Sequence, residues 1–289
     1  MQVEVKERKI YFDGIMKITF DEILESVGAL ESDVVYLAGS LIEGYVDKYS
    51  QGMGNQYSDL DVFVIREHDK YESTEAVYSS DVSKSFFCDE KGLHIEVYDS
   101  NYVQCLTAVL LELNVEKNER ILNTLKKNLE NGNDFYFVNS FLNRFLNSIC
   151  IANKSLYDKI HEGIKFEKFL ELKQYFLVSL IDNAYSDAVG NIQVKQIDTA
   201  LHSIRYMVLT LLEVALAVEG TYVDRDKWIA LKFTNLARAK EKYNSLHSLY
   251  MNVFRGDFSD PDISLRKIEL YIKSVENELE NISLEDLEI

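Results

Sequence analysis

The chain has 289 residues, 47% of them hydrophobic, which is enough to bury a substantial core in one large domain or two modest ones, and we expect two. Its 31 basic and 48 acidic side chains give a formal net charge of −17 at pH 7. Because the field of such a molecule repels phosphates, a nucleic-acid partner is disfavoured and a cationic small molecule is favoured. The three cysteines, Cys88, Cys105 and Cys150, lie far apart and form no CxxC pair, so neither a zinc site nor a disulfide framework is predicted.

The N-terminal segment MQVEVKERKIYFDG contains no basic stretch followed by an apolar one, so a secretory signal is not predicted. We also expect no apolar stretch of the length that crosses a bilayer, about 20 residues. The sequence therefore predicts a soluble, cytoplasmic protein without a membrane partner.

Short apolar runs with many β-branched residues continue up to about Asp99. Before the first of them, ITFDEILESVGALES predicts an amphipathic helix with Thr19 as its N-cap and Glu22 three residues later, the spacing of a capping box. The runs themselves predict four strands, at residues 34–38, 60–65, 85–88 and 93–98.

From Asn101 onward the apolar residues recur with a helical period, as in YVQCLTAVLLELN, FVNSFLNRFLNSICIANKSLYDKI, FEKFLELKQYFLVSLIDNAY and ALHSIRYMVLTLLEVALAV. The single proline and the scattered glycines mark no linker, so we place the domain boundary by this change of period. We expect an α+β fold with a small mixed sheet flanked by helices in residues 1–118 and an all-α helical bundle in residues 119–289.

The first predicted strand ends in Ala38-Gly39-Ser40, and LIEGYV after it can begin a helix. Such a turn presents backbone N–H groups and the Ser40 hydroxyl at a helix N-terminus, a geometry that suits a nucleotide phosphate. The alternative is a tight strand-to-helix turn that needs glycine for its backbone alone, and this is the simpler interpretation of a lone Gly-Ser pair.

Asp59 and Asp61 open the second predicted strand. Because strand side chains alternate, both carboxylates point to one face, while Leu60 and Val62 point to the other. Like charges at this separation repel each other unless a divalent cation neutralises them, and carboxylate oxygens suit Mg²⁺. The alternative is a pair of hydrated aspartates at a solvent-facing strand end.

Glu96, in LHIEVYD, is the third acidic candidate. Alternation places it on one face with His94 and Tyr98, on a strand that can lie beside the aspartate pair. Glutamate is disfavoured on strands unless it is exposed or functional. The order of Gly-Ser turn, Asp-x-Asp and later strand carboxylate favours a functional interpretation of all three.

These motifs resemble the nucleotidyltransferase superfamily that includes DNA polymerase beta, in the order Gly39-Ser40, Gly44, Ser58-Asp59-Leu60-Asp61 followed by VFVI, and Glu96 within HIEVYD. Within it they are most similar to bacterial aminoglycoside nucleotidyltransferases of the streptomycin/spectinomycin adenylyltransferase type. Those antibiotic-modifying enzymes join such a catalytic domain to a helical C-terminal domain. The resemblance covers residues 36–99, about a fifth of the chain.

The resemblance implies a catalytic set that holds one or two Mg²⁺ ions, namely Asp59, Asp61 and Glu96. It also implies that Gly39, Ser40 and Ser58 bind the nucleotide substrate, ATP. In the helical part, RYMVLTLLEVALAVEGTYVDRDKWIALKF resembles the family's long helix, glycine-containing turn and shorter helix with a basic residue near its start. There Arg225 or Lys227 would approach the phosphates, although basic residues in such a turn are more often simply solvated.

The sequence departs from the family in one spacing, because Asp59 follows Ser40 by 19 positions. The extra residues form a polar, glycine-containing loop at residues 45–57. This loop either folds over the nucleotide or a partner, or has no functional role. This departure leaves the identity of the acceptor molecule undetermined, but not the chemistry.

The expected activity is transfer of AMP from ATP to a hydroxyl group of a small, cationic, aminoglycoside-like acceptor. Glu96 would be either the general base on that hydroxyl or a third metal ligand. Two alternatives remain: a protein-modifying, antitoxin-like nucleotidyltransferase, and a nucleotide-binding regulator without turnover. Polynucleotide extension is disfavoured by the acidic net charge.

Overall fold

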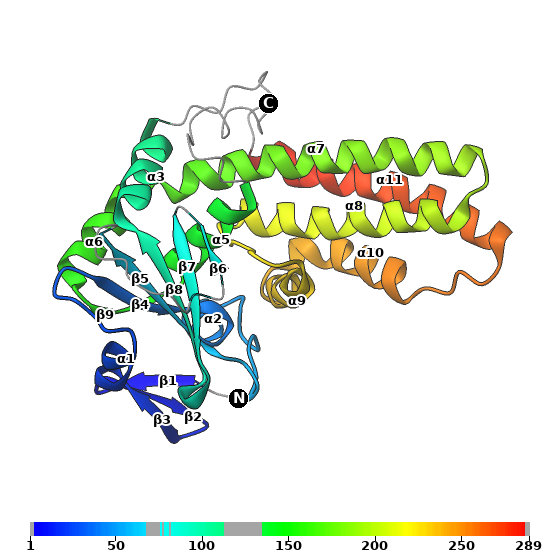
Figure 1. Cartoon of the computed structure of the whole chain (residues 1–289). Coiled ribbons are helices and arrows are strands. Elements are labelled where there is room, and N and C mark those ends of the chain that lie inside the picture. Colours follow the sequence, from blue (N-terminus) through cyan, green and yellow to red (C-terminus); the bar gives the residue numbers. More distant parts are fainter. Residues whose placement is uncertain (1–2, 68–75, 77, 81, 113–134, 287–289) are drawn as a thin grey trace. The chain divides into compact units, whose positions relative to one another are not determined.

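Figure 1 shows the computed structural model of the chain, which describes residues 3–67, 76, 78–80, 82–112 and 135–286. The chain divides into two compact units, Met1–Lys168 and Phe169–Ile289, and we describe each by itself. The expected boundary between residues 118 and 119 lies outside the described residues. The first unit carries the sheets and the second is helical, so the expected α+β class with an all-α C-terminal part is confirmed.

A six-stranded mixed sheet forms the centre of the first unit, with the strand order β6-β7-β8-β5-β4-β9. β5 and β8 are parallel, and the other neighbouring pairs are antiparallel. All four predicted strands are present, with ends that differ by at most two residues. The bounds are β4 (Val34–Ala38), β5 (Leu60–Arg66), β6 (Tyr78–Ser79), β7 (Ser83–Cys88), β8 (Leu93–Asp99) and β9 (Ile149–Ala152).

A separate three-stranded antiparallel sheet, which the sequence analysis does not predict, is formed by β1 (Val3–Lys6), β2 (Lys9–Phe12) and β3 (Ile15–Thr19). Two-residue turns connect its strands, and both turns have positive φ angles, 50° and 58° at Glu7 and Arg8 and 50° and 79° at Asp13 and Gly14. Two positive φ angles in succession are typical of type I′ turns, whose twist matches that of a hairpin. Asp-Gly is a preferred sequence for this turn, so FDGI contains a hairpin signal.

The strand β9 lies in a segment whose periodicity predicts helix. The chain there forms α5 (Phe135–Leu146), β9 and then α6 (Lys154–Gly163). Ile149 and Ile151 are β-branched, and Asn153 takes a left-handed φ of 54° at the start of α6. Pairing with the free edge of β4 supplies a hydrogen-bonding partner that the sequence pattern does not reveal.

The predicted capping box defines the start of α1 (Phe20–Ser26). The Glu22 backbone N–H donates to Thr19 Oγ1 at 3.2 Å, and the Thr19 N–H donates to Glu22 Oε2 at 2.8 Å. These reciprocal bonds satisfy two backbone donors and confirm Thr19 as the N-cap. The other described helices of this unit are α2 (Gly39–Val46), α3 (Ser100–Glu112) and the 3₁₀ turn η2 (Asp89–Lys91).

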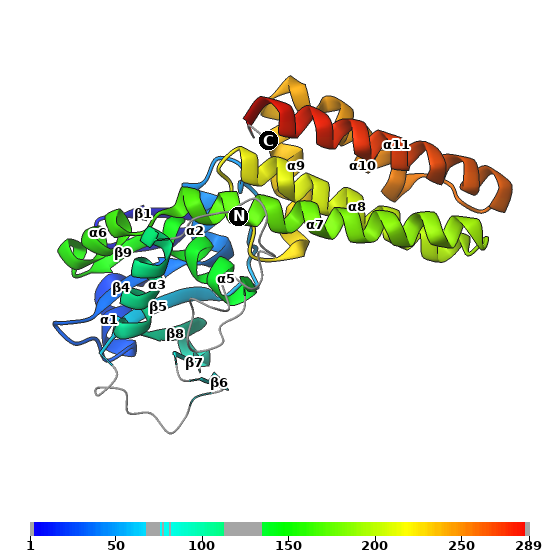
Figure 2. The same ribbon diagram turned by 90° about the horizontal axis from the view of Figure 1, so that it is seen from above.

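The second unit consists of α7 (Phe166–Gln193), α8 (Ile197–Val218), η3 (Asp226–Trp228), α9 (Ile229–Ala239), η4 (Glu241–Tyr243), α10 (Asn244–Arg255) and α11 (Pro261–Asp286). α8 is its central helix, because it contacts α9, α10 and α11. α8 and α11 lie side by side in Figure 1 and in Figure 2.

Contrary to expectation, α8 is long and apolar enough to cross a membrane, with a mean hydropathy of 1.5. In this structure 67% of that stretch is buried inside the protein. A mostly buried apolar helix is what the centre of a helical bundle requires.

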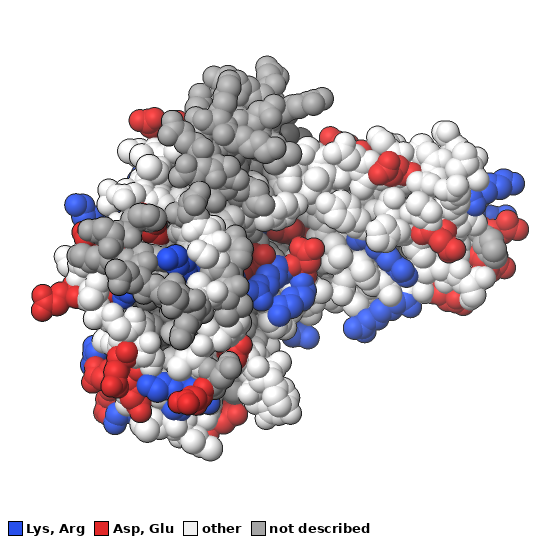
Figure 3. All heavy atoms as spheres, viewed as in Figure 1, with Lys and Arg blue, Asp and Glu red and all other residues white. Residues whose placement is uncertain are grey.

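Charged side chains of both signs share the face of the molecule that Figure 3 shows. Basic side chains occur there singly or in small groups, and the described residues on this face form no extended basic surface. Attraction of phosphates to this acidic chain therefore has to come from local groups.

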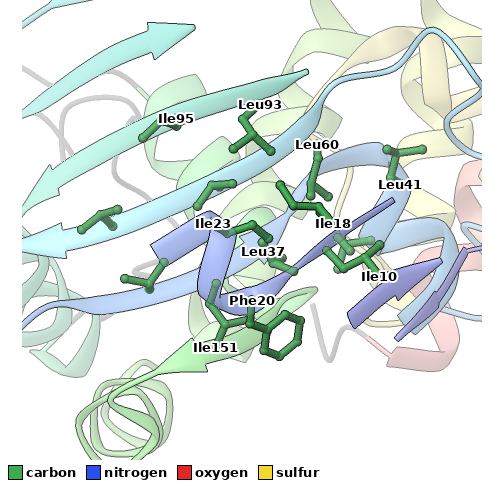
Figure 4. Packing of buried hydrophobic residues seen from close by; sticks show 14 of the residues in the cluster. Ile10, Ile18, Phe20, Ile23, Leu37, Leu41, Leu60, Leu93, Ile95 and Ile151 are labelled. Carbon is green, nitrogen blue, oxygen red and sulfur yellow. The ribbon is translucent and has the colours of Figure 1, made fainter. Parts of the chain in front are cut away.

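Aliphatic side chains fill one face of the six-stranded sheet. Figure 4 shows the sheet residues Leu37, Leu60, Leu93, Ile95 and Ile151 packed with Ile10, Ile18, Phe20, Ile23 and Leu41. β2, β3 and α1 therefore cover this face, and the site described below lies on the opposite one.

The opposite face is aromatic. Phe63 of β5 stacks between Tyr36 and Tyr98, with ring centroids 5.3 and 6.1 Å apart. Two side chains of α5 pack edge-on against the tyrosines, Phe145 at 5.1 Å from Tyr36 and Phe141 at 4.9 Å from Tyr98. α5 thus covers this aromatic face, on which alternation also places Asp61 and Glu96.

Candidate active site

The strand register aligns side chains in rows across the aromatic face. One row, which we call the Asp61 row, consists of Ala38, Asp61, His94 and Phe87. The adjacent Glu96 row consists of Tyr36, Phe63, Glu96 and Ser85. Asp61 and Glu96 therefore lie on the same face, on neighbouring strands and in adjacent rows.

Gly39, the first residue of α2, lies directly against Asp61. Its φ is +76°, and a Cβ atom built on it would lie 2.6 Å from Asp61 Cγ and would overlap the carboxylate. Only glycine combines this backbone angle with this contact. The structure thus brings the Gly39-Ser40 turn and the Asp61 carboxylate together, as the motif interpretation requires.

Asp61 has a hydrogen-bond partner, His94, that no local sequence motif identifies. His94 Nδ1 lies 2.8 Å from Asp61 Oδ1, and the two side chains are 19% and 22% exposed. The His94 ring stacks on Phe87 with centroids 4.9 Å apart. The signal for this contact is the register of β5 against β8, which joins residues 33 positions apart and is not readable from a local pattern.

Asp59 is exposed and precedes the first residue of β5. Ser58 beside it closes a turn of the loop, since its N–H donates to the Asn55 carbonyl at 2.9 Å and its hydroxyl oxygen accepts from the Asn55 N–H at 3.0 Å. Because the Ser58 hydroxyl oxygen acts as the acceptor in this bond, its O–H group can still donate a hydrogen bond to a ligand.

Glu96 is buried and forms an ion pair that no local sequence motif predicts. Arg144 of α5 donates from Nη1 to Glu96 Oε2 at 2.8 Å, and the side chains are 12% and 10% exposed. Burial is the main reason why the pKa values of Tyr36 and Tyr98 are raised well above the ordinary value, and the nearby Glu96 carboxylate raises them further. The positive charge of Arg144 partly opposes this shift. Arg144 is 48 positions from Glu96, in a helix whose apolar pattern gives no hint of a polar contact.

In the part of the chain that the structure describes, no three His, Cys, Asp or Glu side chains are grouped so that they could hold a metal ion. The structure places the Asp61 carboxylate beside the Gly39-Ser40 turn, and Asp59 precedes Asp61 by two positions in the chain, whereas Glu96 is engaged by Arg144. Two carboxylates suit a hard cation that completes its coordination with phosphate oxygens and water.

The loop at residues 45–57 packs against α2. Tyr49 and Met53 are buried, and the buried Glu43 of α2 accepts hydrogen bonds from Ser50 Oγ at 3.3 Å and from Asn143 Nδ2 at 3.2 Å. Glu43 therefore ties the loop and α5 to the helix that begins at Gly39.

Arg225 and Lys227 lie in the second unit. Arg225 is 3.9 Å from the Asp224 carboxylate, and Lys227 Nζ lies 4.9 Å from the centroid of the Trp228 ring. The turn before them is anchored by two buried lysines, Lys173 and Lys232, which donate to the Val223 and Tyr222 carbonyls.

No protein-family model and no curated protein matches the sequence. Among solved structures the chain is similar to the crystal structure of a nucleotidyltransferase-like protein from Exiguobacterium sibiricum 255-15, with 9% identity and a TM-score of 0.46 over 91% of this chain and 74% of that chain. A similarity of this size carries no functional conclusion, so the proposal below rests on the residues of the first unit.

Proposed function

We propose that the chain is a Mg²⁺-dependent nucleotidyltransferase that transfers AMP from ATP to a hydroxyl group of a small, cationic acceptor. The observation that carries the proposal is the contact of Gly39 with the Asp61 carboxylate. In such an enzyme the phosphate-binding turn and the metal-binding carboxylate have to be adjacent, because the metal that Asp61 would hold supplies positive charge to the phosphates that the turn would hold.

The turn would hold the β- and γ-phosphates of the nucleotide. Backbone N–H groups at the start of α2 lack partners within the helix, and the partial positive charge of a helix N-terminus favours an anion. Ser40 and Ser58 would add hydroxyl donors.

Asp59 and Asp61 would hold Mg²⁺, since both reach solvent and offer only oxygen atoms. A bound ion would neutralise the negative charge that develops on the transferred phosphoryl group and on the departing pyrophosphate. The contribution of the protein is to fix the carboxylates against the turn before the substrate arrives.

Glu96, one row from Asp61, would accept the proton of the acceptor hydroxyl as it attacks the α-phosphorus atom. The net charge of −17 favours a cation as the molecule that carries this hydroxyl.

A second candidate, a nucleotide-binding regulator without turnover, is favoured by the Arg144–Glu96 ion pair. A carboxylate that already accepts a charged hydrogen bond is less available to take a proton. Both candidates require nucleotide binding at the Gly39-Ser40 turn, and only the first requires transfer.

The test begins with thermal unfolding in the presence of each nucleoside triphosphate, with and without Mg²⁺. We expect a Mg²⁺-dependent stabilisation by ATP, which Asp59→Asn/Asp61→Asn removes while the fold is retained. If neither ATP nor any other nucleoside triphosphate stabilises the chain in a Mg²⁺-dependent way, both candidates are wrong.

Transfer is then measured by mass spectrometry after incubation with ATP, Mg²⁺ and hydroxyl-bearing cations such as streptomycin and spectinomycin. The added mass of one AMP group on the small molecule supports the proposal. The same mass on a polypeptide indicates a protein acceptor, and nucleotide binding without any transfer supports the regulator.

A further inference from the structure

The Arg144–Glu96 ion pair lies inside the proposed site, and Arg144 has no role in the proposed transfer itself. The two charged groups are 2.8 Å apart, and both side chains are almost entirely withdrawn from solvent. Charge-assisted hydrogen bonds are among the strongest that side chains make, and removing one partner leaves a buried charge unpaired. The pair is therefore a fixed part of the protein.

Arg144 is held in place by its own surroundings. Its guanidinium carbon lies 5.3 Å from the centroid of the Phe63 ring, in the Glu96 row. Its neighbours in α5 are Asn143, which donates to Glu43, and Phe145, which is fully buried. A guanidinium with this support orients its partner before any substrate binds.

The ion pair also decides what Glu96 can bind. A metal ion at Glu96 would have to approach a carboxylate that is 10% exposed and already lies 2.8 Å from the Arg144 cation. The Asp61 carboxylate is 22% exposed, and its hydrogen-bond partner among the described residues is a histidine. A divalent cation can therefore reach Asp61, and the exposed Asp59, more easily than it can reach Glu96.

We infer that Arg144 is a positioning residue that keeps Glu96 out of the metal site and fixes its carboxylate one row away, where the acceptor hydroxyl would bind. The inference rests on the proposed function, and it resolves the choice between metal ligand and acceptor contact in favour of the second.

The direct test is the affinity of the full chain for Mn²⁺ alone, measured from the electron paramagnetic resonance signal of the free ion. Mn²⁺ accepts the same carboxylate ligands as Mg²⁺. We expect Glu96→Gln to bind Mn²⁺ with unchanged affinity. A weakening of about tenfold or more, the usual effect of losing a group that supports a metal site, would show that Glu96 is a ligand and would overturn the inference.

The converse variant is Arg144→Met, which frees the Glu96 carboxylate. We expect it to raise the Mn²⁺ affinity, and we expect the double variant Arg144→Met/Glu96→Gln to return the affinity to that of the wild type. Unchanged affinity in a folded Arg144→Met chain would contradict the inference. If Arg144→Met does not fold, the Glu96→Gln measurement decides alone.

A matched control is Arg66→Met. Arg66 forms an ion pair of the same kind with the buried Asp33, at 2.6 Å, and lies at the other end of β5 from Asp61. Its loss should lower stability and leave the Mn²⁺ affinity unchanged.

Asp61→Asn separates the inference from the proposed function. It should weaken Mn²⁺ binding by at least about tenfold, because it removes a ligand. If Asp61→Asn and Glu96→Gln both leave Mn²⁺ binding unchanged, the proposed metal site is wrong. If only Glu96→Gln weakens it, the site exists elsewhere on the sheet and the role given to Arg144 is wrong.

Discussion

Gly39 shows at the residue scale how tightly the site is assembled. Its left-handed backbone and the missing Cβ serve two different needs, because the first turns the chain from β4 into α2 and the second makes room for the Asp61 carboxylate. The two needs can be separated by comparison with Gly14, which has nearly the same φ, +79°, but no atom within 4 Å of the position of a Cβ.

We predict that Gly39→Ala lowers the free energy of unfolding by more than Gly14→Ala does. Both variants carry the left-handed strain of about 1 kcal/mol, and Gly39→Ala adds an overlap with Asp61 that costs about 1–3 kcal/mol. Urea unfolding of both variants measures the difference. Equal losses would mean that Gly39 and Asp61 are not in contact.

The buried Tyr36 hydroxyl is a second residue with a measurable consequence. It has no hydrogen-bond partner among the residues that the structure describes, although the ring is fully buried. We predict that Tyr36→Phe raises the free energy of unfolding by about 1 kcal/mol, because an unsatisfied buried hydroxyl is unfavourable.

Tyr157→Phe is the control for Tyr36→Phe. The Tyr157 hydroxyl is 2.8 Å from Ser148 Oγ and donates to the Phe145 carbonyl at 3.3 Å, so its removal should destabilise the protein by about 1 kcal/mol. A loss of stability in Tyr36→Phe would show that its hydroxyl has a partner in solution.

The helices and strands of the first unit differ in how well the sequence predicts them. Thr19 and Glu22 specify the start of α1 from four adjacent residues, and the four predicted strands have clear apolar runs. β9 is different, because a four-residue strand inside a helical period exists only through its pairing with β4. Asp13-Gly14 is a recognisable hairpin turn, but in β3 after it the apolar residues Ile15, Met16 and Ile18 do not alternate with polar ones, so the pattern does not indicate a strand.

The same distinction applies to the candidate site. Gly39, Ser40, Asp59 and Asp61 flank the turn and loop that join two antiparallel strands, so a local motif identifies them. His94 and Arg144 reach Asp61 and Glu96 only through strand register and helix packing, which no local pattern contains.

At the scale of elements, α6 packs against α5 through aromatic contacts that include the titratable ring of His161. The His161 ring lies 5.9 Å from Phe145 and 5.1 Å from Phe166, and burial lowers its pKa below the ordinary 6.5, against the opposing charge of Asp158. Below pH 6.5 the unfolded chain therefore takes up a proton that the folded chain does not.

We predict that the stability of the wild type falls as the pH is lowered from 6.5 toward the depressed pKa of His161, and that His161→Phe removes this part of the slope. Urea midpoints at pH 7.5, 6.5 and 5.5 measure it. His202→Gln is the control, since His202 is exposed and its change should leave the slope in place. An identical slope in His161→Phe would show that the ring is already charged in the folded protein.

At the scale of the whole molecule, the chain is a sheet-based unit followed by a helical one, and the first extends to Lys168. Its last elements belong to the sheet, because β9 pairs with the edge of β4 and α5 buries Phe141 and Phe145 on the aromatic face. A chain that ends before α5 would expose that face to water.

We predict that a fragment of residues 1–168 unfolds cooperatively on heating, as followed by circular dichroism, and that a fragment of residues 1–118 does not. The shorter fragment lacks β9, α5 and α6, so the stacked rings of Tyr36, Phe63 and Tyr98 have no cover. Cooperative unfolding of the shorter fragment would show that the sheet is stable without them.

The hydrogen bond between Glu43 and Asn143 spans 100 positions of the chain, and Arg144 next to it reaches back to Glu96. At a synthesis rate of about 5–20 residues per second, the ribosome releases the acidic residues several seconds before the helix that orders them. A nascent chain therefore presents the carboxylates of the candidate site on an uncovered aromatic surface, the kind that chaperones bind. The candidate site is complete only when α5 docks, so its assembly is one of the last events in the synthesis of the first unit.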